Sequence, residues 1–488
     1  MNIRLYNTLT KSIDEFTPLK KSVGIYSCGP TVYNYVHIGN LRSFLFADIL
    51  QRIVKTVGGY PVQWVMNITD IDDKTIRDSA FDSPSWNKQI GNQSSDVHQN
   101  LRQLTEFYTK EFLNDINAVG IESVDFYALP KATSFIPQMQ DLITKIFDAG
   151  FAYIADGSVY FNVEKWQEKE QYGRLFAIEK EAFKKGVRID ADEYERENVS
   201  DFVLWKTKKG NEPSWKYVLN GENLVGRPGW HIECSAMEFE LLGLPFDIHT
   251  GGLDLKFPHH EDEIAQSKAG YGIDPTTFWC HNEFLLVEGK KMSKSLGNFF
   301  TLRDLIQKGY DPIDFRFYMI SAHYRSLFNF TFEALDASVK GRERIQDFIY
   351  SLLEAENLNN ETGIEDILSF EKVVYEALSN DLHIPKALST IFSFINSFEI
   401  TTLSTEKKNK LIEIFTSLNM VFNAFHFELK EKKEIPIPEI VLELASKRDM
   451  AKRAKDFALA DTLRKAIHEA GYSVNDSAQG YILVKNGN

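Results

Sequence analysis

Cysteine is scarce in this chain. Only Cys28, Cys234 and Cys280 occur among 488 residues, whereas small domains that are held together by disulfides carry cysteine at a far higher density. A disulfide framework is therefore excluded. Each of the three thiols is either a free side chain or a metal ligand.

Long apolar runs are also missing. No stretch approaches the roughly 20 apolar residues that a helix needs to cross a bilayer. The first residues, MNIRLYNTLTKSIDEF, lack the apolar core of a signal peptide. Hydrophobic residues make up 43% and charged residues 25%, which is the ordinary balance of a soluble globular protein. We expect a cytoplasmic protein that does not contact membranes.

Positive charge is the third property in short supply. The formal net charge is −14 at pH 7, so the molecule as a whole lacks the basic surface of a nonspecific nucleic-acid binder. One region near the end departs from this balance, because residues 446–465 carry seven basic against three acidic side chains. Any contact with nucleic acid must come from a local patch of this kind.

The first part of the chain predicts a parallel sheet. Residues 23–27 read as a short buried strand, apolar residues from 41 to 57 follow helical spacing up to Gly58-Gly59, and residues 61–68 read as the next strand. Strand, helix and strand in this order form a βαβ unit with a right-handed crossover.

The rest of the chain is more varied. Helical patterns cover 96–119 and 133–149, a hairpin turn is expected at Asp156-Gly157, and residues 163–225 read as a charged, irregular part of an insertion. After Trp230 we expect a strand over 246–249, a tight loop at Gly251-Gly252 and a helix from Pro258 to about Lys268. Residues 302–426 are almost entirely helical by pattern, and residues 430–438 read as a linker. These patterns divide the chain into a first α/β half (1–120), an insertion (121–225), a second α/β half (226–300), a helical region (301–430) and a small last module (441–488).

The most distinctive string is KMSKS, residues 291–295. It follows Gly289, which suits a mobile loop. Its two lysines, Lys291 and Lys294, can neutralise a polyphosphate and stabilise charge that builds up in a transition state. The alternative is a solvated charged loop, which is what most lysine-rich stretches are.

A second candidate for phosphate binding is HIGN, residues 37–40. Helix N-termini leave N–H groups free and carry partial positive charge, Gly39 allows a close backbone approach, and His37 can donate to a phosphate oxygen. The alternative is a plain helix start with Asn40 as the N-cap residue. Two such strings, far apart in the sequence, suggest an enzyme that binds ATP across two half-domains.

Several side chains have the chemistry of metal ligands. His259 and Glu263 are four residues apart on a predicted helix and so share one face, and an imidazole with a carboxylate can hold Zn²⁺, which thiolates such as Cys28 and Cys234 favour further. The spacing does not prove that these groups meet. A solvated helix face is the alternative, made easier by the polar residues between the pair, and Cys280 reads as a buried structural thiol.

Three carboxylates follow the second strand in NITDIDDK. Asp70, Asp72 and Asp73 could hold Mg²⁺ or a substrate amine. They could equally be loop and cap residues, and the sequence does not decide between these interpretations.

Taken together, the strings resemble the cysteinyl-tRNA synthetases, a family of class I aminoacyl-tRNA synthetases. The resemblance spans most of the chain and includes its last segment, KRAKDFALADTLRKAIHEAGYSV. The other matching strings are YSCGPTVYNYVHIGN (26–40), NITDIDDK (67–74), GRPGWHIECSAM (226–237), FPHHEDEIAQS (257–267), KMSKSLGN (291–298) and HYRS (323–326). The family implies an α/β fold, in which a Rossmann-like parallel-sheet catalytic domain with an insertion is followed by a helical bundle and a small C-terminal anticodon-binding module.

The resemblance also implies a reaction. L-cysteine and ATP, bound with Mg²⁺, would give cysteinyl-adenylate and pyrophosphate, and the cysteinyl group would pass to the 3′ end of tRNA(Cys). One Zn²⁺ per chain would select the thiol, and the protein would be a monomer. The implied metal ligands are Cys28, Cys234, His259 and Glu263, and the implied contacts with the substrate cysteine are Cys28, Thr69 and Trp230. The implied ATP contacts are His37, Gly39, Asn40, Lys291 and Lys294, and all of these except Gly39 are also implied to be catalytic. The implied tRNA contacts are Arg453, Lys455 and Phe457.

The chain departs from the family pattern in three places. Asn40 replaces the usual His but keeps an amide donor, so we expect ATP contact to survive. Thr250 takes the place of the first glycine in a loop that often has three, and Phe457 stands where Trp is common. A phenyl ring can still stack on a base, at about 1–3 kcal/mol.

Two other interpretations compete with this one. The nearest is the related ligase that joins cysteine to an amino sugar in mycothiol synthesis, which resembles a shorter chain without an anticodon module. The basic region at 446–465 argues for tRNA instead. A zinc-stabilised binding protein with an inactive core is the other alternative, and the intact lysines and candidate ligands argue against it.

Overall fold

The computed structural model describes residues 1–176, 201–293, 297–355, 364–400, 403–429, 438–477 and 480–485. They form two compact units, Met1–Phe427 and Glu428–Asn488. Among these residues no helix has both the length and the apolar character that crossing a bilayer requires.

A four-stranded parallel sheet lies at the centre of the first unit. Its order is β11-β10-β3-β4, from Thr276–Asn282, Phe246–Gly252, Val23–Ser27 and Val62–Met66. The helix α1, Ile38–Thr56, connects β3 to β4, and these two strands pair in parallel. The predicted βαβ unit is confirmed. All five residues of β3 are buried, as expected for a central strand that is covered on both faces.

The C-terminal end of β10 differs from the prediction. Gly251 and Gly252 do not form a tight loop, because they continue β10 and pair with His281 and Asn282 of β11. The predicted helix from Pro258 begins as a short irregular turn, Lys256–His260, and continues as α8, Glu261–Tyr271. The non-helical backbone at Phe257 separates the two parts.

The insertion forms a second sheet of five strands in the order β5-β6-β7-β9-β8. Asp156 and Gly157 both have positive φ, at 49° and 74°, and they connect β5 to β6 as the predicted hairpin turn. The irregular conformation expected for residues 163–225 is wrong at Val163–Gln167, which form a helix, and from residue 202 onward, where three strands pair. Residues 177–200 lie outside the described part of the chain. The strands are β5 Ala152–Ala155, β6 Ser158–Phe161, β7 Phe202–Thr207, β8 Trp215–Leu219 and β9 Glu222–Pro228.

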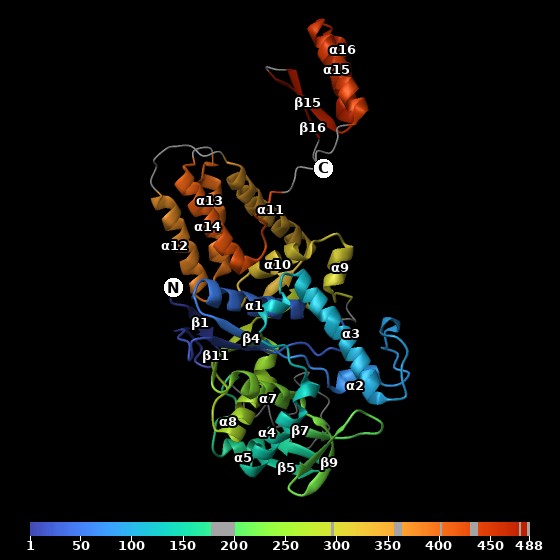
Figure 1. Cartoon of the computed structure of the whole chain (residues 1–488), viewed down its shortest axis with the longest axis vertical. Coiled ribbons are helices and arrows are strands. Elements are labelled where there is room, and N and C mark those ends of the chain that lie inside the picture. Colours follow the sequence, from blue (N-terminus) through green and yellow to red (C-terminus); the bar gives the residue numbers. More distant parts are fainter. Residues whose placement is uncertain are drawn as a thin grey trace. The chain divides into compact units, whose positions relative to one another are not determined.

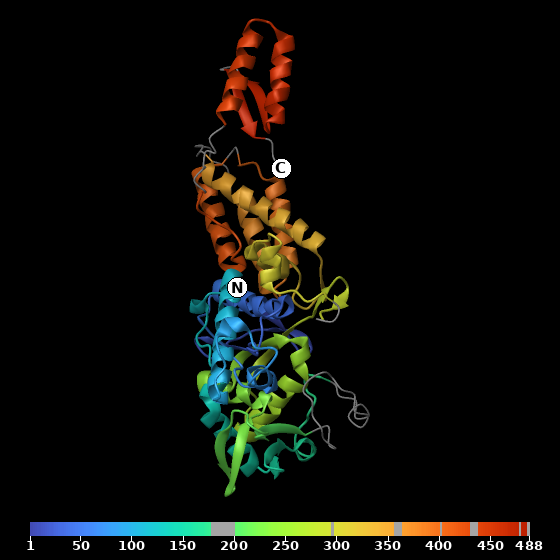
Figure 2. The same ribbon diagram turned by 90° about the vertical axis from the view of Figure 1, so that its right-hand side faces the viewer.

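Helices surround both sheets. Figure 1 shows the bundle α11–α14 on one side of α1 and the insertion strands on the opposite side of the central sheet, and Figure 2 gives the same arrangement from the side. The helices of the catalytic part and insertion are α2 Asp73–Ser79, α3 Val97–Ala118, α4 Ile136–Asp148, α5 Val163–Gln167 and α7 Trp230–Leu242. Those of the region predicted to be helical are α9 Leu302–Gln307, α10 Pro312–Ser321, α11 Phe332–Glu354, α12 Glu365–Ser379, α13 Ile384–Ser397 and α14 Thr405–Phe422.

Short strands complete the first unit. The hairpin of β1, Arg4–Asn7, and β2, Ser12–Glu15, stands beside the sheet. A small three-stranded sheet joins the start of the lysine loop to the helical region, because β12 pairs with both β13 and β14. Its strands are β12 Leu285–Val287, β13 Lys290–Lys291 and β14 Phe328–Phe330.

The second unit is small and has its own core. Its elements are α15 Glu439–Arg453, α16 Phe457–Glu469, β15 Tyr472–Ser477 and β16 Gly480–Lys485. Val441, Ala445, Ile467, Tyr472 and Val474 are buried together. The helices and the antiparallel pair β15-β16 thus share one apolar cluster.

A buried ion pair links α1 to the helical region. Arg316 of α10 and Asp48 of α1 are both fully buried, with 2.6 Å between Nη2 and Oδ2. Arg316 also donates to the carbonyl oxygens of Phe422, at 2.6 Å, and Val119, at 2.9 Å. One guanidinium therefore holds the ends of α14 and α3 against the helix that starts at the HIGN string.

We predict that Asp48→Ala lowers the free energy of unfolding by about 3–5 kcal/mol, because it leaves a buried guanidinium without its counter-charge. Urea unfolding followed by circular dichroism measures the change. Asp141→Ala is the control, since Asp141 pairs with Lys145 on the surface and its loss changes stability by about 0.5 kcal/mol or less. Equal effects of the two substitutions would contradict the structural role of the buried pair.

Candidate active site and metal centre

Four side chains predicted as metal ligands meet in one cluster, in which Cys28 is partly exposed and the other three are buried. Cys28 follows β3, Cys234 lies in α7, His259 precedes α8 and Glu263 is in its first turn. Their ligand atoms all lie within 4.8 Å of one another. His259 and Glu263 are 1% and 0% exposed, so the alternative of a solvated helix face is wrong.

The distances within this cluster fit a shared metal ion. The two sulfur atoms are 4.0 Å apart, which is far beyond a disulfide bond of about 2.05 Å and close to the spacing of two thiolates on one tetrahedral Zn²⁺. Nε2 of His259 lies 3.5 Å from Sγ of Cys234 and 2.9 Å from Oε1 of Glu263. Two thiols, an imidazole and a carboxylate form a donor set that suits zinc.

The structure also brings together a second possible ligand set. Cys28, His249, His260 and Glu263 satisfy the same distance criterion, and Nε2 of His260 lies 3.3 Å from Sγ of Cys28. The ring of His260 also contacts His281, at 2.8 Å. The set with two thiols is the better zinc site, because thiolates bind zinc more strongly than additional imidazoles do.

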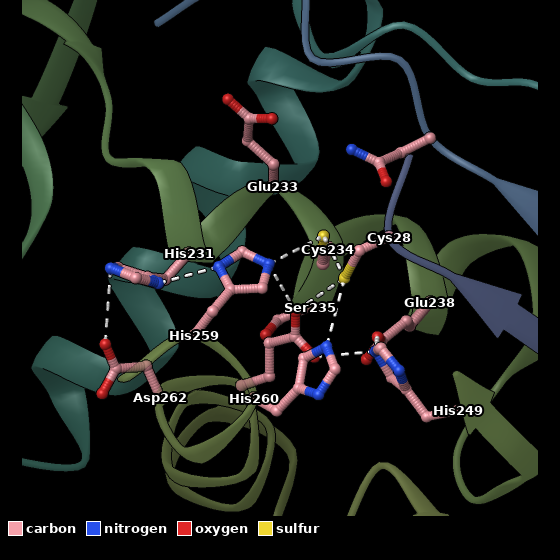
Figure 3. Close-up of polar contacts among 12 residues, drawn as sticks. Cys28, His231, Glu233, Cys234, Ser235, Glu238, His249, His259, His260 and Asp262 are labelled. Carbon is pink, nitrogen blue, oxygen red and sulfur yellow. Dashed lines mark hydrogen bonds and ion pairs between the residues drawn. The ribbon is translucent and has the colours of Figure 1, made fainter. Parts of the chain in front are cut away.

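Buried polar groups surround the cluster, and sequence reasoning missed them. Nδ1 of His259 lies 2.9 Å from Nδ1 of His231, and His231 lies 3.5 Å from Asp262, which accepts a hydrogen bond from Tyr172. Figure 3 shows this row of side chains beside the sulfur atoms. Such contacts fix the orientation of a metal-binding ring. Asp262 is therefore not part of a solvated face, although its place among polar neighbours in FPHHEDE suggested one.

His249 and Glu238 form a further layer behind Glu263. Nε2 of His249 lies 2.8 Å from Oε2 of Glu263 and 2.9 Å from Oε1 of Glu238. Burial by itself lowers the pKa of His249, but the two carboxylates raise it to about 10. The positive imidazole in turn holds Glu263 in its ionised form, which is the form that binds a metal. The string FDIHTGG of β10 gives no sign of this role for His249.

The electrostatics of the two thiols differ. Burial raises the pKa of Cys28 well above its usual value, and the nearby Cys234 thiol and Glu263 carboxylate raise it further. Burial acts on Cys234 in the same direction, but the hydrogen bond with Cys28 and the charge on His259 lower its pKa to about 6. A metal ion that binds here displaces the remaining thiol proton.

Thr69 and Trp230 lie next to the cluster. The indole of Trp230 stacks on the imidazole of His259, with 4.2 Å between ring centroids. Oγ1 of Thr69 donates to Glu233 at 2.8 Å, and Glu233 directly precedes the ligand Cys234. The two residues that the family resemblance assigns to the bound amino acid are thus brought together with the proposed metal ligands.

The carboxylates of NITDIDDK have structural partners. Asp70 accepts from the backbone and hydroxyl of Thr133, at 2.8 and 2.6 Å. Asp72 is the N-cap residue of α2, and Asp73 pairs with Lys206 and Arg227. The contacts favour the interpretation as loop and cap residues over the alternative of a magnesium site.

The HIGN string forms a helix cap, but not in the predicted way. His37, rather than Asn40, is the N-cap residue of α1: its Nδ1 accepts from the backbone of Gly39, at 3.1 Å, and of Asn40, at 3.2 Å. Oδ1 of Asn40 accepts from the backbone N–H of His37 in return. These N–H groups are therefore not free for phosphate. Because Nδ1 accepts, the proton of a neutral His37 ring is on Nε2, which can donate.

The HIGN and KMSKS strings are adjacent in the fold. A Cβ atom at Gly39 would lie 2.6 Å from the end of the Met292 side chain, so Gly39 and Met292 are in close contact. Ile38 donates to the carbonyl oxygen of Phe300 at 2.9 Å. Lys291 is exposed at the end of β13, and Lys294 lies outside the described residues.

Fold and site together define a class I tRNA synthetase catalytic domain. The family model described as tRNA synthetases class I (C) catalytic domain matches residues 15–340. A methionyl-tRNA synthetase of Mycobacterium tuberculosis in complex with methionyl-adenylate has a similar fold, with a TM-score of 0.55 and 12% identity over 82% of this chain and 90% of that one. A putative arginyl-tRNA synthetase from Campylobacter jejuni has a TM-score of 0.51, with 12% identity over 83% and 92% of the two chains.

The relatives in sequence are more specific. A cysteine–tRNA ligase of Leptospira interrogans serogroup Icterohaemorrhagiae serovar copenhageni is 42% identical over 98% of both chains. One of Chlamydia pneumoniae is 41% identical over 97% of this chain and 96% of its own, and one of Protochlamydia amoebophila is 37% identical over 99% and 98%. The chain belongs to the cysteine–tRNA ligase family. The family resemblance and the predicted fold class are confirmed.

We predict that Cys234→Ser removes bound metal, because a hydroxyl is a much weaker zinc ligand than a thiolate. Metal per chain, measured by mass spectrometry on purified protein, falls from one ion to near zero. Cys280→Ser is the matched control: Cys280 is also fully buried, but its sulfur contacts the carbonyl oxygen of Tyr6 instead. Retention of metal by Cys234→Ser, or its equal loss from both variants, would show that the cluster is not the metal site.

Proposed function

We propose that this protein is a zinc-dependent ligase that joins L-cysteine to tRNA(Cys) in the cytoplasm, as a monomer. The observation that carries the proposal is the convergence of Cys28, Cys234, His259 and Glu263 beside Thr69 and Trp230. Zinc in this cluster would take the substrate thiolate as an additional ligand and so separate cysteine from serine. Hydrogen bonds alone would separate two such similar amino acids poorly.

The side chains of HIGN and KMSKS would act on ATP. Nε2–H of His37 and the amide of Asn40 would hold the nucleotide from one side, with Gly39 allowing close approach, and Lys291 and Lys294 would neutralise the phosphates from the other. The cysteine carboxylate then attacks the α-phosphorus, the bond to the bridging oxygen breaks, and pyrophosphate leaves with Mg²⁺. Positioning and charge stabilisation are sufficient for such a step.

The last module would read the tRNA. Phe457 begins α16 and is 61% exposed, so its ring is accessible to a nucleic-acid base. Lys455 precedes it by two residues, and the side chain of Arg453 is 75% exposed beside Asp449. An exposed ring flanked by cations can stack on a base and contact the phosphate backbone. Arg448 does not belong to this surface, because it is only 4% exposed.

The amino-sugar ligase of mycothiol synthesis is the less favoured alternative. The cysteine–tRNA ligases named above match this chain over 97–99% of its length, which includes the last module. The amino-sugar ligase resembles a shorter chain that has no such module.

The first test is ATP–pyrophosphate exchange with the purified protein. We predict exchange that requires cysteine, is not supported by serine, and is followed by transfer of cysteine to tRNA but not to an amino sugar. Labelled cysteine in acid-precipitable RNA measures the transfer. Exchange without cysteine, or transfer to glucosaminyl-inositol in place of tRNA, would overturn the assignment.

We predict that Phe457→Ala lowers kcat/KM for tRNA by about 5- to 150-fold, which corresponds to about 1–3 kcal/mol of lost stacking. ATP–pyrophosphate exchange stays unchanged, since that reaction does not use tRNA. Met450→Ala is the control, because Met450 is equally exposed, at 66%, on the neighbouring helix α15. A matching loss in Met450→Ala, or none in Phe457→Ala, would exclude a role of this ring in tRNA binding.

A further inference from the structure

The carboxylate of Glu233 is buried, and only one of its two oxygens accepts a hydrogen bond from the described part of the chain. Glu233 is 1% exposed. One of its oxygens accepts a hydrogen bond from Oγ1 of Thr69 at 2.8 Å, whereas Oε1 has no hydrogen-bonding partner among the residues that the structure describes. Figure 3 shows this carboxylate pointing away from the two sulfur atoms, and it belongs to neither possible ligand set. A buried acceptor without a donor calls for one from outside the chain.

A relay of three hydrogen bonds fixes the polarity of Thr69. The backbone N–H of Gly29 donates to Oδ1 of Asn67 at 2.8 Å, which sets the orientation of this amide. Nδ2 of Asn67 then donates to Oγ1 of Thr69 at 3.0 Å. Since the only hydroxyl proton of Thr69 goes to Glu233, what Thr69 has left for a ligand is an oxygen lone pair. With Glu233 ionised, Thr69 and Glu233 together form a site that only accepts hydrogen bonds.

Such a site fits the ammonium group of an amino acid. Ammonium has three donors and no acceptor, and its bonds to a carboxylate are charge-assisted. Burial raises the pKa of Glu233 well above its usual value, and the nearby Cys234, Asp72 and Asp70 raise it further, so the ionised carboxylate is stabilised by a cation beside it. A substrate carboxylate, by contrast, finds repulsion here.

We propose that Glu233, with Thr69, binds the α-ammonium group of the substrate and so positions its carboxylate for reaction. This inference rests on the proposed function, in which the thiol is held by the metal and the carboxylate must stay free to attack ATP. Holding the amino acid by its sulfur and its nitrogen leaves the third functional group unbound. Glu233 would thus distinguish cysteine from thiols that lack an amine.

Two thiols serve as probes of this site. Cysteamine has the thiol and the ammonium but no carboxylate, and 3-mercaptopropionate has the thiol and the carboxylate but no ammonium. Both are measured as competitive inhibitors of cysteine in ATP–pyrophosphate exchange. Glu233→Gln, which keeps an acceptor for Thr69 but loses the charge, raises KM for cysteine and Ki for cysteamine by about 10- to 100-fold. The Ki of 3-mercaptopropionate changes by less than about threefold, and metal content stays at the wild-type value.

Asp70→Asn is the matched control. Asp70 is also a buried carboxylate in this neighbourhood, but both of its oxygens accept from Thr133. A general loss of folding in this variant would affect all three ligands alike. The loss of the Asp70 charge alone should shift the cysteamine to 3-mercaptopropionate ratio in the same direction as Glu233→Gln but by much less, because Asp70 bonds to Thr133 and not to the ligand. Thr69→Val should shift this ratio in the same direction as Glu233→Gln, and Thr69→Ser should restore it.

The outcomes separate the inference from the function. If Glu233→Gln and Thr69→Val weaken all three thiols equally, or change none of them, the ammonium site is refuted while cysteine-dependent exchange by the wild type still supports the ligase. If the wild type shows no such exchange, the proposed function fails first. A selective loss of cysteine and cysteamine supports the inference.

Discussion

The site depends on one constraint: four ligand atoms from distant parts of the chain must meet in a space that is largely buried. Cys28 is held at the end of the buried strand β3, Cys234 projects from α7, and His259 and Glu263 come from the segment that enters α8. Burying two thiols, an imidazole and a carboxylate this close together costs free energy in an ordinary protein core. Their arrangement is intelligible as a metal site in which each charge is compensated.

The surrounding polar groups follow from the same constraint. A buried carboxylate such as Glu263 needs a positive partner, and His249 supplies it at 2.8 Å. His259 needs its second ring nitrogen fixed, and His231 lies 2.9 Å from it. Thr69 needs a defined proton position, and Asn67 and Glu233 provide it. The pocket is therefore a set of fixed donors and acceptors, which suits the proposed binding of an amino acid with a thiol.

The sequence was most informative where the pattern is local. Apolar periodicity predicted β3, α1 and the helical region because each depends on the burial of neighbouring residues. The turn at Asp156-Gly157 was predictable because few residue pairs accept positive φ in succession. Charge patterns were less reliable, since residues 202–225 read as irregular but contribute to three strands.

The site was predictable only in part. Family resemblance assigned the four ligands, whereas spacing alone left His259 and Glu263 open to a solvated face. Burial of His249, Asp262 and Glu233 arises from tertiary packing, for which a single sequence carries no signal. The capping role of His37 was missed for another reason, because imidazole is an uncommon N-cap side chain and Asn40 is a common one.

X-ray absorption spectroscopy of the zinc-loaded protein tests the central claim most directly. The account predicts two sulfur ligands at about 2.3 Å with nitrogen or oxygen in the remaining positions, and a third sulfur when cysteine is added but not when serine is added. A zinc ion with fewer than two sulfur ligands, or one whose coordination is unchanged by cysteine, would contradict it.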